Sequence, residues 1–559
     1  MEITGAQAIL ECLKKEGVDI IFGYPGGVVL PLYDALYHEK NIKHILVRHE
    51  QGAGHAADAY ARASGKVGVA LATSGPGACN LVTAIANAYM DSIPVVFLTG
   101  QVSTPLLGKD SFQESDIIGI TMPITKHNYL IKKAEDIPAI FKEAFHIART
   151  GRCGPVVIDL PKDVQINKLN FKYPDKVKLA GYNPTYQGNL KQIKAAAKLI
   201  SASKRPILYI GGGVIASNAN KELLALAEKC IIPVTTTLMG LGAFPDHHKL
   251  ALHMLGMHGS AYANYAVTDS DLLIAVGARF DDRVTGHIER FAPNAKIIHI
   301  DIDPAEIGKN VRVDVPIVGD IKDVLKKLIE EVKSKDNHKA WLDQIKELKA
   351  KYKLSYKDDG KVIKPQFVLE TLSKITQGKD IVICTEVGQH QMWAAQFFMY
   401  DKPRSWISSG GLGTMGFGLP AAIGAQFARP HATVFNIAGD GSIQMNIQEL
   451  ATAVNNKLPI KIIVLNNCFL GMVRQWQELL HGKRYSSTNL CQNPDLVKIA
   501  EAYGLKAMRI SEKDQVESTL KQALEYKDGP MLIDIVVAKE ENVLPFVPAG
   551  QAINEMIID

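Results

Sequence analysis

The chain has 559 residues, 47% of them hydrophobic and 22% charged, and carries a formal net charge of +5. This length predicts three or four domains, and the composition is typical of a globular enzyme. A net charge this small, without blocks of Lys and Arg, argues against nucleic acid or a membrane as a partner.

The cysteines and the first residues both favour a cytoplasmic location. The seven cysteines are dispersed and form no CxxC pair, which is typical of reduced thiols. The opening MEITGAQAILECLKKEG predicts a capped amphipathic helix and lacks the basic and apolar regions of a signal peptide. The most apolar stretch, 67–100, is broken by glycine, proline and Asp91, so no membrane span is expected.

Three blocks of alternating strands and helices follow one another along the chain. Residues 1–180 place short apolar strands, such as VGVALA and PVVIDLP, between helical segments, and residues 190–345 and 362–547 do the same. This alternation predicts doubly wound parallel sheets, so we expect an α/β protein of three such domains with a tail over 548–559. The first and third blocks are open to sharing a fold. Residues 174–187 predict a linker, and the Lys-rich stretch 322–361 predicts a solvated helix plus linker.

The third block contains a candidate metal–diphosphate site. Asp440, in the sequence GDGS, follows an expected strand over 432–438, and Asn467 follows the next parallel strand over 460–465, with a helical segment over 446–455 between them. Carboxyl ends of parallel strands are where α/β sheets bind ligands. Asp and Asn oxygens suit Mg²⁺, which usually also takes phosphate oxygens. Either half alone is more simply a turn or a loop, but both at this spacing favour the site. The pattern resembles the thiamine-diphosphate motif, which begins GDG and ends NN.

Glu50 in the first block is the candidate activating carboxylate. It follows the strand HILVR and opens a helix rich in Ala and Gly. Its position alone is explained by the preference of acidic residues for helix N-termini. Thiamine diphosphate, however, needs a carboxylate against N1′ of its pyrimidine. Gly75-Pro76-Gly77 also follows a strand and adds a further ligand-facing loop.

With these motifs the chain resembles the catalytic large subunits of acetohydroxyacid synthase, also called acetolactate synthase. The resemblance covers essentially all 559 residues, and GARFDDRVTG with GMVRQWQ narrows it to the biosynthetic, FAD-containing branch of the thiamine-diphosphate enzymes. The other markers are GYPGG (23–27), RHEQGA (48–53), TSGPG (73–77), FQE (112–114), GPVVIDLPKDV (154–164), EVGQHQMW (386–393), GGLGTMGFGLPAAIGA (410–425) and LNNCFLGMVRQWQ (465–477).

The resemblance implies where thiamine diphosphate and Mg²⁺ bind. It makes Asp440, Asn467 and the backbone carbonyl of Phe469 the metal ligands, Met415 the apolar wedge that bends the cofactor, and the Gly413 carbonyl an acceptor for the 4′-amino group. The full cofactor set that it implies is Val387, Gly388, Gln389, His390, Gly413, Met415, Gly439, Gly441, Ser442 and Met472.

FAD is implied in the second block. From the residues alone, the GGG after the strand PILYI indicates only a possible nucleotide cleft, and GARFDDRVTG is equally well explained as a surface ion-pair loop. In the family, FAD takes no net part in the redox balance. The residues that the resemblance assigns to FAD are Arg152, Gly211, Gly212, Gly213, Thr237, Leu238, Met257, His258, Arg279, Asp281, Arg283, Val284, Asp301 and Asp320.

The implied reaction is acetolactate synthesis. Pyruvate is decarboxylated, and the hydroxyethyl carbanion on the cofactor condenses with pyruvate or 2-oxobutyrate, giving 2-acetolactate or 2-aceto-2-hydroxybutyrate for branched-chain amino acids. Besides Glu50, the resemblance places Phe112, Gln113, Lys162 and Trp476 on the substrate side. Lys162 is also compatible with facing solvent, and an isolated Trp476 is more simply a packing residue.

Other assignments stay open from the sequence. A pyruvate oxidase or a simple 2-oxo acid decarboxylase of the same superfamily shares the cofactor motif, and a non-catalytic nucleotide-binding protein shares the α/β pattern. The intact Glu50, Asp440 and Asn467 argue against the last of these. The resemblance further implies a homodimer or homotetramer with its active site at the chain interface, and a small regulatory subunit.

Overall fold

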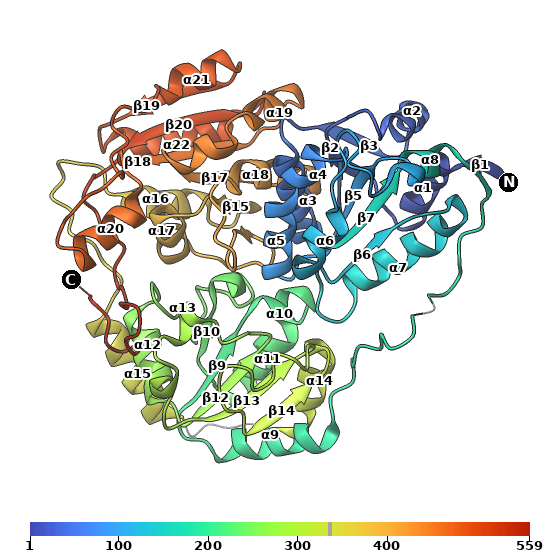
Figure 1. The fold of residues 1–559 in the computed structure, drawn as a ribbon. Helices are drawn as coiled ribbons and strands as arrows, with labels where there is room; N and C mark the ends of the chain where they lie inside the picture. The colour runs from blue at the N-terminus through green and yellow to red at the C-terminus, as the bar shows by residue number, and fades with distance from the viewer. Residues whose placement is uncertain (178, 334–337, 559) are drawn as a thin grey trace.

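A computed structural model describes residues 1–177, 179–333 and 338–558. Within these residues, three parallel sheets flanked by helices form an N-terminal, a central and a C-terminal domain (Figure 1). This is the α/β class that the alternating pattern predicted. The few residues left out fall in the expected linker, the Lys-rich stretch and the last position of the tail, and those parts of the predictions lie outside the described residues.

The N-terminal domain is built on a parallel sheet with the order β3-β2-β4-β5-β7-β6. Its strands are β2 (Ile20–Gly23), β3 (Lys43–Leu46), β4 (Gly68–Ala72), β5 (Val95–Gln101), β6 (His127–Leu130) and β7 (Val156–Pro161), while β1 (Glu2–Thr4) pairs antiparallel with β8 (Lys168–Asn170). Its helices are α1 (Gly5–Lys15), α2 (Leu30–His38), α3 (Glu50–Ser64), α4 (Pro76–Asn80), α5 (Val82–Met90), α6 (Ile117–Thr121), α7 (Ile137–Arg149) and α8 (Lys162–Ile166), with 3-10 turns η1 (Thr104–Leu106), η2 (Met122–Ile124) and η3 (Ala134–Asp136).

The C-terminal domain repeats this strand order as β16-β15-β17-β18-β20-β19. Counted along each domain, both sheets run 2-1-3-4-6-5, so the first and third blocks share a topology. The strands are β15 (Ile381–Thr385), β16 (Trp406–Ile407), β17 (Thr433–Gly439), β18 (Lys461–Asn466), β19 (Lys506–Ile510) and β20 (Met531–Val536). The helices are α16 (Pro365–Thr376), α17 (Gln389–Phe397), α18 (Gly418–Ala428), α19 (Glu449–Asn455), α20 (Gly471–Leu480), α21 (Leu496–Ala502) and α22 (Gln515–Glu525), with the 3-10 turn η6 (Ser442–Asn446).

The central domain has a different order, β11-β10-β9-β12-β13-β14, which is 3-2-1-4-5-6 along the chain. This is the order of dinucleotide-binding sheets, whose ligands bind where the order reverses, here between β9 and β12. The strands are β9 (Pro206–Ile210), β10 (Val234–Thr236), β11 (Ala251–Met254), β12 (Leu272–Val276), β13 (Lys296–Asp301) and β14 (Val315–Val318). The helices are α9 (Leu190–Ala202), α10 (Gly212–Ala216), α11 (Asn220–Cys230), α12 (Ala261–Asp269), α13 (Asp282–Thr285), α14 (Ile321–Glu331) and α15 (Lys339–Lys351), with 3-10 turns η4 (Leu238–Gly240) and η5 (Ile288–Arg290).

The Lys-rich stretch is more than a solvated helix and linker. Helix α14 buries Val324, Leu325 and Leu328 in the core of the central sheet, and α15 buries Trp341 on the other side. The prediction gave too much weight to the lysines, which lie on the outer faces of two amphipathic helices. The tail also packs on this domain, since Ile553 joins its core and Glu555 pairs with Arg290.

Helices α3 and α18 pack side by side at the centre of the molecule and join the N-terminal and C-terminal domains (Figure 1). Both helices are rich in Ala and Gly, and the alanines of the two helices belong to one shared core. A Cβ on Gly424 would lie 2.0 Å from the carbonyl oxygen of Ala56, so only glycine allows this approach. Within the described residues, no helix is long and apolar enough to cross a membrane.

Candidate active site

The loops after β15 and β17 flank the point where the C-terminal sheet reverses its strand order, which is where α/β sheets bind ligands. Strands β17 and β18 are adjacent and parallel, with Gly439 opposite Leu465, so Asp440 and Asn467 leave the same edge of the sheet. This confirms the expected strand pair. The helical segment predicted for 446–455 begins as the 3-10 turn η6 and becomes α-helical only at Glu449.

Asp440 has the properties of a cation ligand. Asp440 is only 2% exposed. Its carboxylate faces the backbone N–H groups of Asp440 and Asn467, yet neither oxygen has a hydrogen-bonding partner of normal geometry. Burial raises the pKa of Asp440 to about 7. A buried carboxylate without a partner is unfavourable, and a cation at this position would compensate it.

The other oxygen atoms near Asp440 that could bind a metal belong to amide groups. The Asn467 side-chain amide donates to Gln389 Oε1 at 3.2 Å, while its Oδ1 accepts the backbone N–H of Phe469 at 3.1 Å. Within the described residues no group of three or more His, Cys, Asp or Glu side chains gathers to hold a metal. One carboxylate with an amide and a backbone carbonyl leaves positions for phosphate oxygens and water, which is the coordination that Mg²⁺ favours.

His390 lies over two of the predicted glycines. A Cβ would lie 2.9 Å from the imidazole ring at both Gly388 and Gly439, so side chains there are excluded. The ring is buried, its Nε2 has no hydrogen-bonding partner, and burial lowers the pKa of His390 to about 3. His390 lies in the first turn of α17, where backbone N–H groups are free of partners within the helix. Helix N-termini bind anions for this reason, so an anionic phosphate fits beside His390. Ser442 closes the turn by accepting the Gly439 N–H at 3.1 Å.

The remaining predicted cofactor residues surround this edge. Gly413 (φ 70°) lies in an exposed bend, Met415 and Met472 are half-buried, and Val387 is the nearest side chain to Gly413. At Gly441 a Cβ would lie within 3 Å of the terminal methyl groups of Leu470 and Leu490, so a side chain in the turn after Asp440 would displace these two leucines.

The Glu50 side forms a second, separate half-site in the N-terminal domain. Glu50 begins α3, is 9% exposed, and accepts a hydrogen bond from the Asn80 amide at 2.9 Å through Oε2. Its Oε1 lies 3.1 Å from where a Cβ on Gly77 would stand, so the predicted Gly-Pro-Gly loop does face this carboxylate. Gln113 lies against the same loop, because a Cβ on Gly75 would be 2.7 Å from its carbonyl oxygen.

The other predicted substrate residues lie at the surface of one chain. The Phe112 side chain is 87% exposed, and Lys162, at the start of α8, is half-buried. In the described residues, the hydrogen bonds around Glu50 share no member with those around Asp440. The hydrogen bonds described for one chain therefore do not join the two predicted half-sites.

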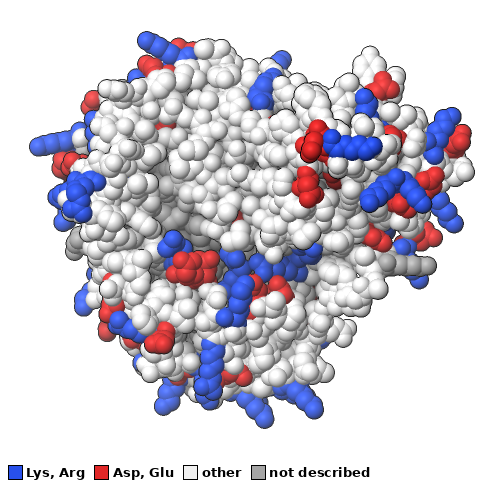
Figure 2. Space-filling view, viewed as in Figure 1, with Lys and Arg blue, Asp and Glu red and all other residues white. Residues whose placement is uncertain are grey.

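A large cavity, called here the interdomain cavity, opens between the three domains. It has a volume of about 830 Å³, within the range of small-molecule and cofactor sites. It lies at the reversal of the central sheet, where the Gly211 N–H donates to the carbonyl of Val276 and a Cβ on Gly211 would lie 2.2 Å from the Gly277 oxygen. Lys and Arg side chains gather where the central domain meets the other two (Figure 2).

All fourteen residues that the resemblance assigned to FAD line the interdomain cavity. Arg279 pairs with Asp281 at 3.4 Å, and Arg152 reaches across the domain boundary to Glu306 at 2.6 Å. Burial raises the pKa of Asp301 to about 6. The GARFDDRVTG loop thus faces the cavity through Arg279, Asp281 and Arg283, while its second ion pair, between Arg283 and Asp282, is exposed.

Trp476 stands on α20, directly after the metal loop. Its ring is half-buried, with the Arg283 guanidinium 5.9 Å and the Phe546 ring 6.4 Å from the ring centroid. The indole Nε1 has no hydrogen-bonding partner. Since Arg283 also lines the interdomain cavity, Trp476 lies between that cavity and the loop of Asn467.

Several polar residues around the site were missed from the sequence. Glu386, in the marker EVGQHQMW, is fully buried and accepts the N–H groups of Gly416 and Leu419. Glu449 accepts the N–H groups of Arg48 and His49 and so fixes the start of α3 from the other domain. The signal that could have found them is a carboxylate inside an otherwise apolar segment, which needs a partner when buried.

Comparison with known proteins agrees with this fold and site. Family models match the chain as "Thiamine pyrophosphate enzyme, N-terminal TPP binding domain" over residues 3–120, "central domain" over 193–328 and "C-terminal TPP binding domain" over 386–535. The chain therefore belongs to the thiamine pyrophosphate enzymes.

The relatives narrow the family. The chain is 56% identical to the probable acetolactate synthase large subunit of Methanocaldococcus jannaschii, covering 99% of this chain and 95% of that protein. It is 52% identical to the large subunit of Corynebacterium glutamicum (98% and 89% covered) and 50% identical to that of Haemophilus influenzae (100% and 98% covered). Within the thiamine pyrophosphate enzymes, the chain belongs to the acetolactate synthase large subunits.

Proposed function

We propose that this chain catalyses the decarboxylation of pyruvate and joins the remaining two-carbon unit to a second 2-oxo acid. With pyruvate as acceptor the product is 2-acetolactate, and with 2-oxobutyrate it is 2-aceto-2-hydroxybutyrate. The observation that carries the proposal is Asp440, a buried carboxylate whose two oxygens lack partners beside Asn467, in a domain matched as thiamine pyrophosphate-binding.

Thiamine diphosphate and Mg²⁺ fit the residues present. Asp440, Asn467 and the Phe469 carbonyl would hold the metal, and His390 with the start of α17 would hold the diphosphate. When bound, the cofactor supplies an electron sink for the carbanion that decarboxylation leaves. The chain itself binds and orients the diphosphate, and the glycines at 388, 439 and 441 keep the approach clear of side chains.

Glu50 would share a proton with a ring nitrogen of the cofactor. The Asn80 amide donates a hydrogen bond to Glu50 Oε2, which leaves Oε1 for the cofactor. Oε1 lies beside Gly77, which has no side chain and so leaves room for a ring. A carboxylate buried in this way has few alternatives to a partner on the ligand. Among the substrate residues, Lys162 would hold the carboxylate of an incoming oxo acid, and Phe112, Gln113 and Trp476 would exclude water from the reacting carbons.

The complete site would form between two copies of the chain. Glu50 and Asp440 share no hydrogen-bonding partner among the described residues of one chain, and exposed apolar side chains, Phe112 and Leu412, stand next in sequence to the predicted site residues Gln113 and Gly413. In Figure 2, few Lys, Arg, Asp or Glu side chains lie on the middle of the face, over the C-terminal domain and its junction with the N-terminal domain, while charged side chains gather over the outer part of the N-terminal domain. Such a face favours a homodimer, or a homotetramer made of such dimers, in which a second copy covers it.

FAD would occupy the interdomain cavity without net electron transfer. The support is the strand order 3-2-1-4-5-6 together with glycines at its reversal and fourteen assigned residues in one cavity.

A small regulatory subunit is proposed because the relatives are named large subunits. A cytoplasmic location is proposed because the chain resembles biosynthetic enzymes.

Product analysis with pyruvate alone tests the reaction. We expect acetolactate, formed only when thiamine diphosphate and Mg²⁺ are both present, with no oxygen consumed and the flavin spectrum unchanged during turnover. Acetate with peroxide would assign the chain to an oxidase instead, and acetaldehyde would make it a simple decarboxylase.

A further inference from the structure

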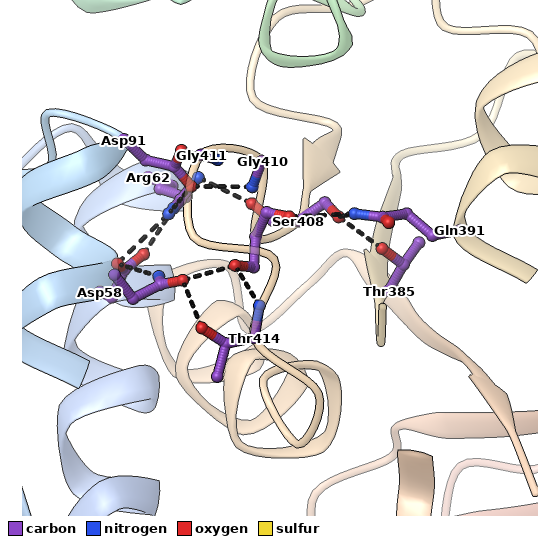
Figure 3. A network of polar contacts seen from close by, with 11 residues as sticks. Asp58, Arg62, Asp91, Thr385, Gln391, Ser408, Gly410, Gly411 and Thr414 are labelled. Carbon is purple, nitrogen blue, oxygen red and sulfur yellow. Dashed lines mark hydrogen bonds and ion pairs between the residues drawn. The ribbon is translucent and has the colours of Figure 1, made fainter. Parts of the chain in front are cut away.

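The carboxylate of Asp91 reaches from the N-terminal domain to the backbone of the C-terminal domain (Figure 3). Asp91 caps the C-terminal end of α5, and its two oxygens accept the N–H of Gly410 at 3.0 Å and the N–H of Gly411 at 2.7 Å. Its side chain is only 1% exposed, so both bonds are shielded from water. These residues are distant in sequence and meet only in the folded chain.

Asp91 is itself held in place by α3. Arg62 donates to Asp91 Oδ2 at 3.0 Å and to Asp58 at 2.5 and 3.2 Å, so the guanidinium bridges two buried carboxylates. The same side chain donates to the carbonyl of Ser408 at 2.9 Å. Because Arg62 stays charged and makes four hydrogen bonds, it holds the carboxylate of Asp91 in one orientation.

A second set of bonds holds the rest of residues 408–415, called here the cofactor segment, which contains Gly410 and Gly411. Asn87 of α5 donates to Asp58 at 3.0 Å, and its Oδ1 accepts the hydroxyl of Ser409 at 2.6 Å. The Ser409 oxygen in turn accepts the backbone N–H of Thr414 at 2.8 Å. The hydroxyl of Thr414 completes the set by donating to Asn87 Oδ1 at 3.3 Å.

The other side of the segment is tied to the C-terminal domain itself. Gln391, on α17 next to His390, donates to the Ser408 hydroxyl at 2.7 Å and to the Ser409 carbonyl at 3.0 Å. Thr385, at the end of β15, shares a hydrogen bond of 2.6 Å with Ser408. The segment therefore lies between the N-terminal domain and the helix that carries the diphosphate residues (Figure 3).

A side chain would be crowded at both glycines that Asp91 contacts. A Cβ on Gly411 would lie 3.1 Å from Asp91 Oδ1, and one on Gly410 would lie 2.4 Å from the sulfur of Met239. Without side chains the two N–H groups approach the carboxylate directly, but two glycines in sequence are also conformationally free. Their order in the folded protein thus depends on the carboxylate that binds them.

We infer that Asp91, oriented by Arg62 and Asp58, is a positioning residue for the cofactor segment 408–415. The inference rests on the proposed function, in which Gly413 and Met415 contact thiamine diphosphate. A segment already ordered by Asp91 loses less conformational freedom when the cofactor binds, so affinity is higher. The positioning residues lie on α3 and α5, and α3 also carries Glu50 at its start, so one helix serves both cofactor half-sites of the chain.

The test compares Asp91→Asn with Asp246→Asn. Asp246 is also a buried carboxylate that accepts a backbone N–H across a domain boundary, from Tyr400 at 2.8 Å, but its bonds go to Tyr400 and His253 and not to residues 408–415. Amide hydrogen exchange is measured on both cofactor-free variants, and the Kd for thiamine diphosphate with Mg²⁺ is measured by calorimetry. For Asp91→Asn we expect faster exchange over 408–415 and a Kd raised roughly 10- to 100-fold, the scale of a hydrogen bond to a charged group.

Asp246→Asn should leave exchange over 408–415 and the Kd as in the wild type. Wild-type exchange and affinity in Asp91→Asn would overturn the inference, and so would an equal loss of affinity in both variants, because that would be a general effect of domain packing. If Asp91→Asn does not fold, Ser409→Ala is used instead: it removes the acceptor of the Thr414 N–H and the donor to Asn87, so it cuts the second set of bonds from the N-terminal domain to the segment, and unchanged exchange over 408–415 would overturn the inference equally. A wild-type protein that binds no thiamine diphosphate would refute the proposed function, while the exchange comparison still decides whether Asp91 orders the segment.

Discussion

The carboxylate of Glu386 accepts the backbone N–H of Gly416 at 2.7 Å, at the far end of the segment that Asp91 holds. Its other oxygen accepts the N–H of Leu419 at 3.1 Å. Burial nevertheless outweighs these bonds and raises the pKa of Glu386 from 4.5 to about 7. The folded protein therefore binds a proton at Glu386 over a pH range in which the unfolded chain has released it.

A pH dependence of stability follows from Glu386. Because its pKa is higher in the folded state, its contribution to stability is complete below about pH 4.5 and is lost as the pH rises to about 7. The loss is on the order of 3 kcal/mol at most. Thermal unfolding at pH 5 and pH 8 checks this: wild type should lose more stability across that range than Glu386→Gln. Equal losses would show that Glu386 keeps its ordinary pKa.

Glu50→Gln should keep the fold and still bind thiamine diphosphate, because the amide preserves the shape and the bond to Asn80. The carboxylate that shares a proton with the cofactor ring is lost, so exchange of the cofactor C2 proton and turnover should fall roughly 10²- to 10⁴-fold. NMR of C2 hydrogen–deuterium exchange is the measurement. Exchange at the wild-type rate would remove Glu50 from this role.

Asp440→Asn should change the protein in two opposite directions. Without cofactor the variant should unfold at a higher temperature than wild type, since an unpaired buried carboxylate has been removed. With thiamine diphosphate and Mg²⁺, wild type should gain about 2.7 kcal/mol at a hundredfold excess over Kd, and the variant should gain almost nothing. Calorimetric scans with and without both ligands decide it, and Asp246→Asn serves as the control. A variant stabilised as much as wild type would move the metal site elsewhere.

Trp476→Leu should alter the choice of acceptor. The ring lies near both Arg283 and Phe546 on the helix that follows the metal loop, where it would form an aromatic wall for the second oxo acid. One methylene in an apolar pocket is worth about 1–3 kcal/mol, or roughly 10- to 200-fold in discrimination. With pyruvate and 2-oxobutyrate both present, the ratio of the two products should shift toward acetolactate while acetolactate formation itself is largely kept. An unchanged ratio in a folded variant would leave Trp476 a packing residue.

The sequence predicted what lies within a single βαβ unit. Asp440 and Asn467 were placed correctly at adjacent strand ends because the strands that carry them are consecutive, and consecutive strands of this kind pair in parallel. Glu50 was likewise placed at the start of its helix from the residues around it. The family resemblance supplied the FAD residues, which local chemistry alone left as an open cleft or a surface loop.

Long-range contacts could not be predicted in this way. Asp91 and Gly411 are 320 positions apart, and neither residue carries a local signal of the other. The shared strand order of the first and third domains was also hidden, because topology depends on which strands pair and not on their individual patterns. The many lysines of 322–361 led to the prediction of a solvated helix. The apolar positions of α14, which recur every three or four residues and are buried, indicate instead a helix packed on the sheet.

In the proposed dimer, Glu50 of one chain and Asp440 of another complete one site. Mixing the inactive variants Glu50→Gln and Asp440→Ala, with exchange of subunits confirmed by native mass spectrometry, tests it most directly. If the site lies between chains, each mixed dimer has one intact site, and random exchange makes half of the dimers mixed, so acetolactate formation should recover to about one quarter of wild type. Mixed dimers with no more activity than the two variants alone would show that the site lies within a single chain.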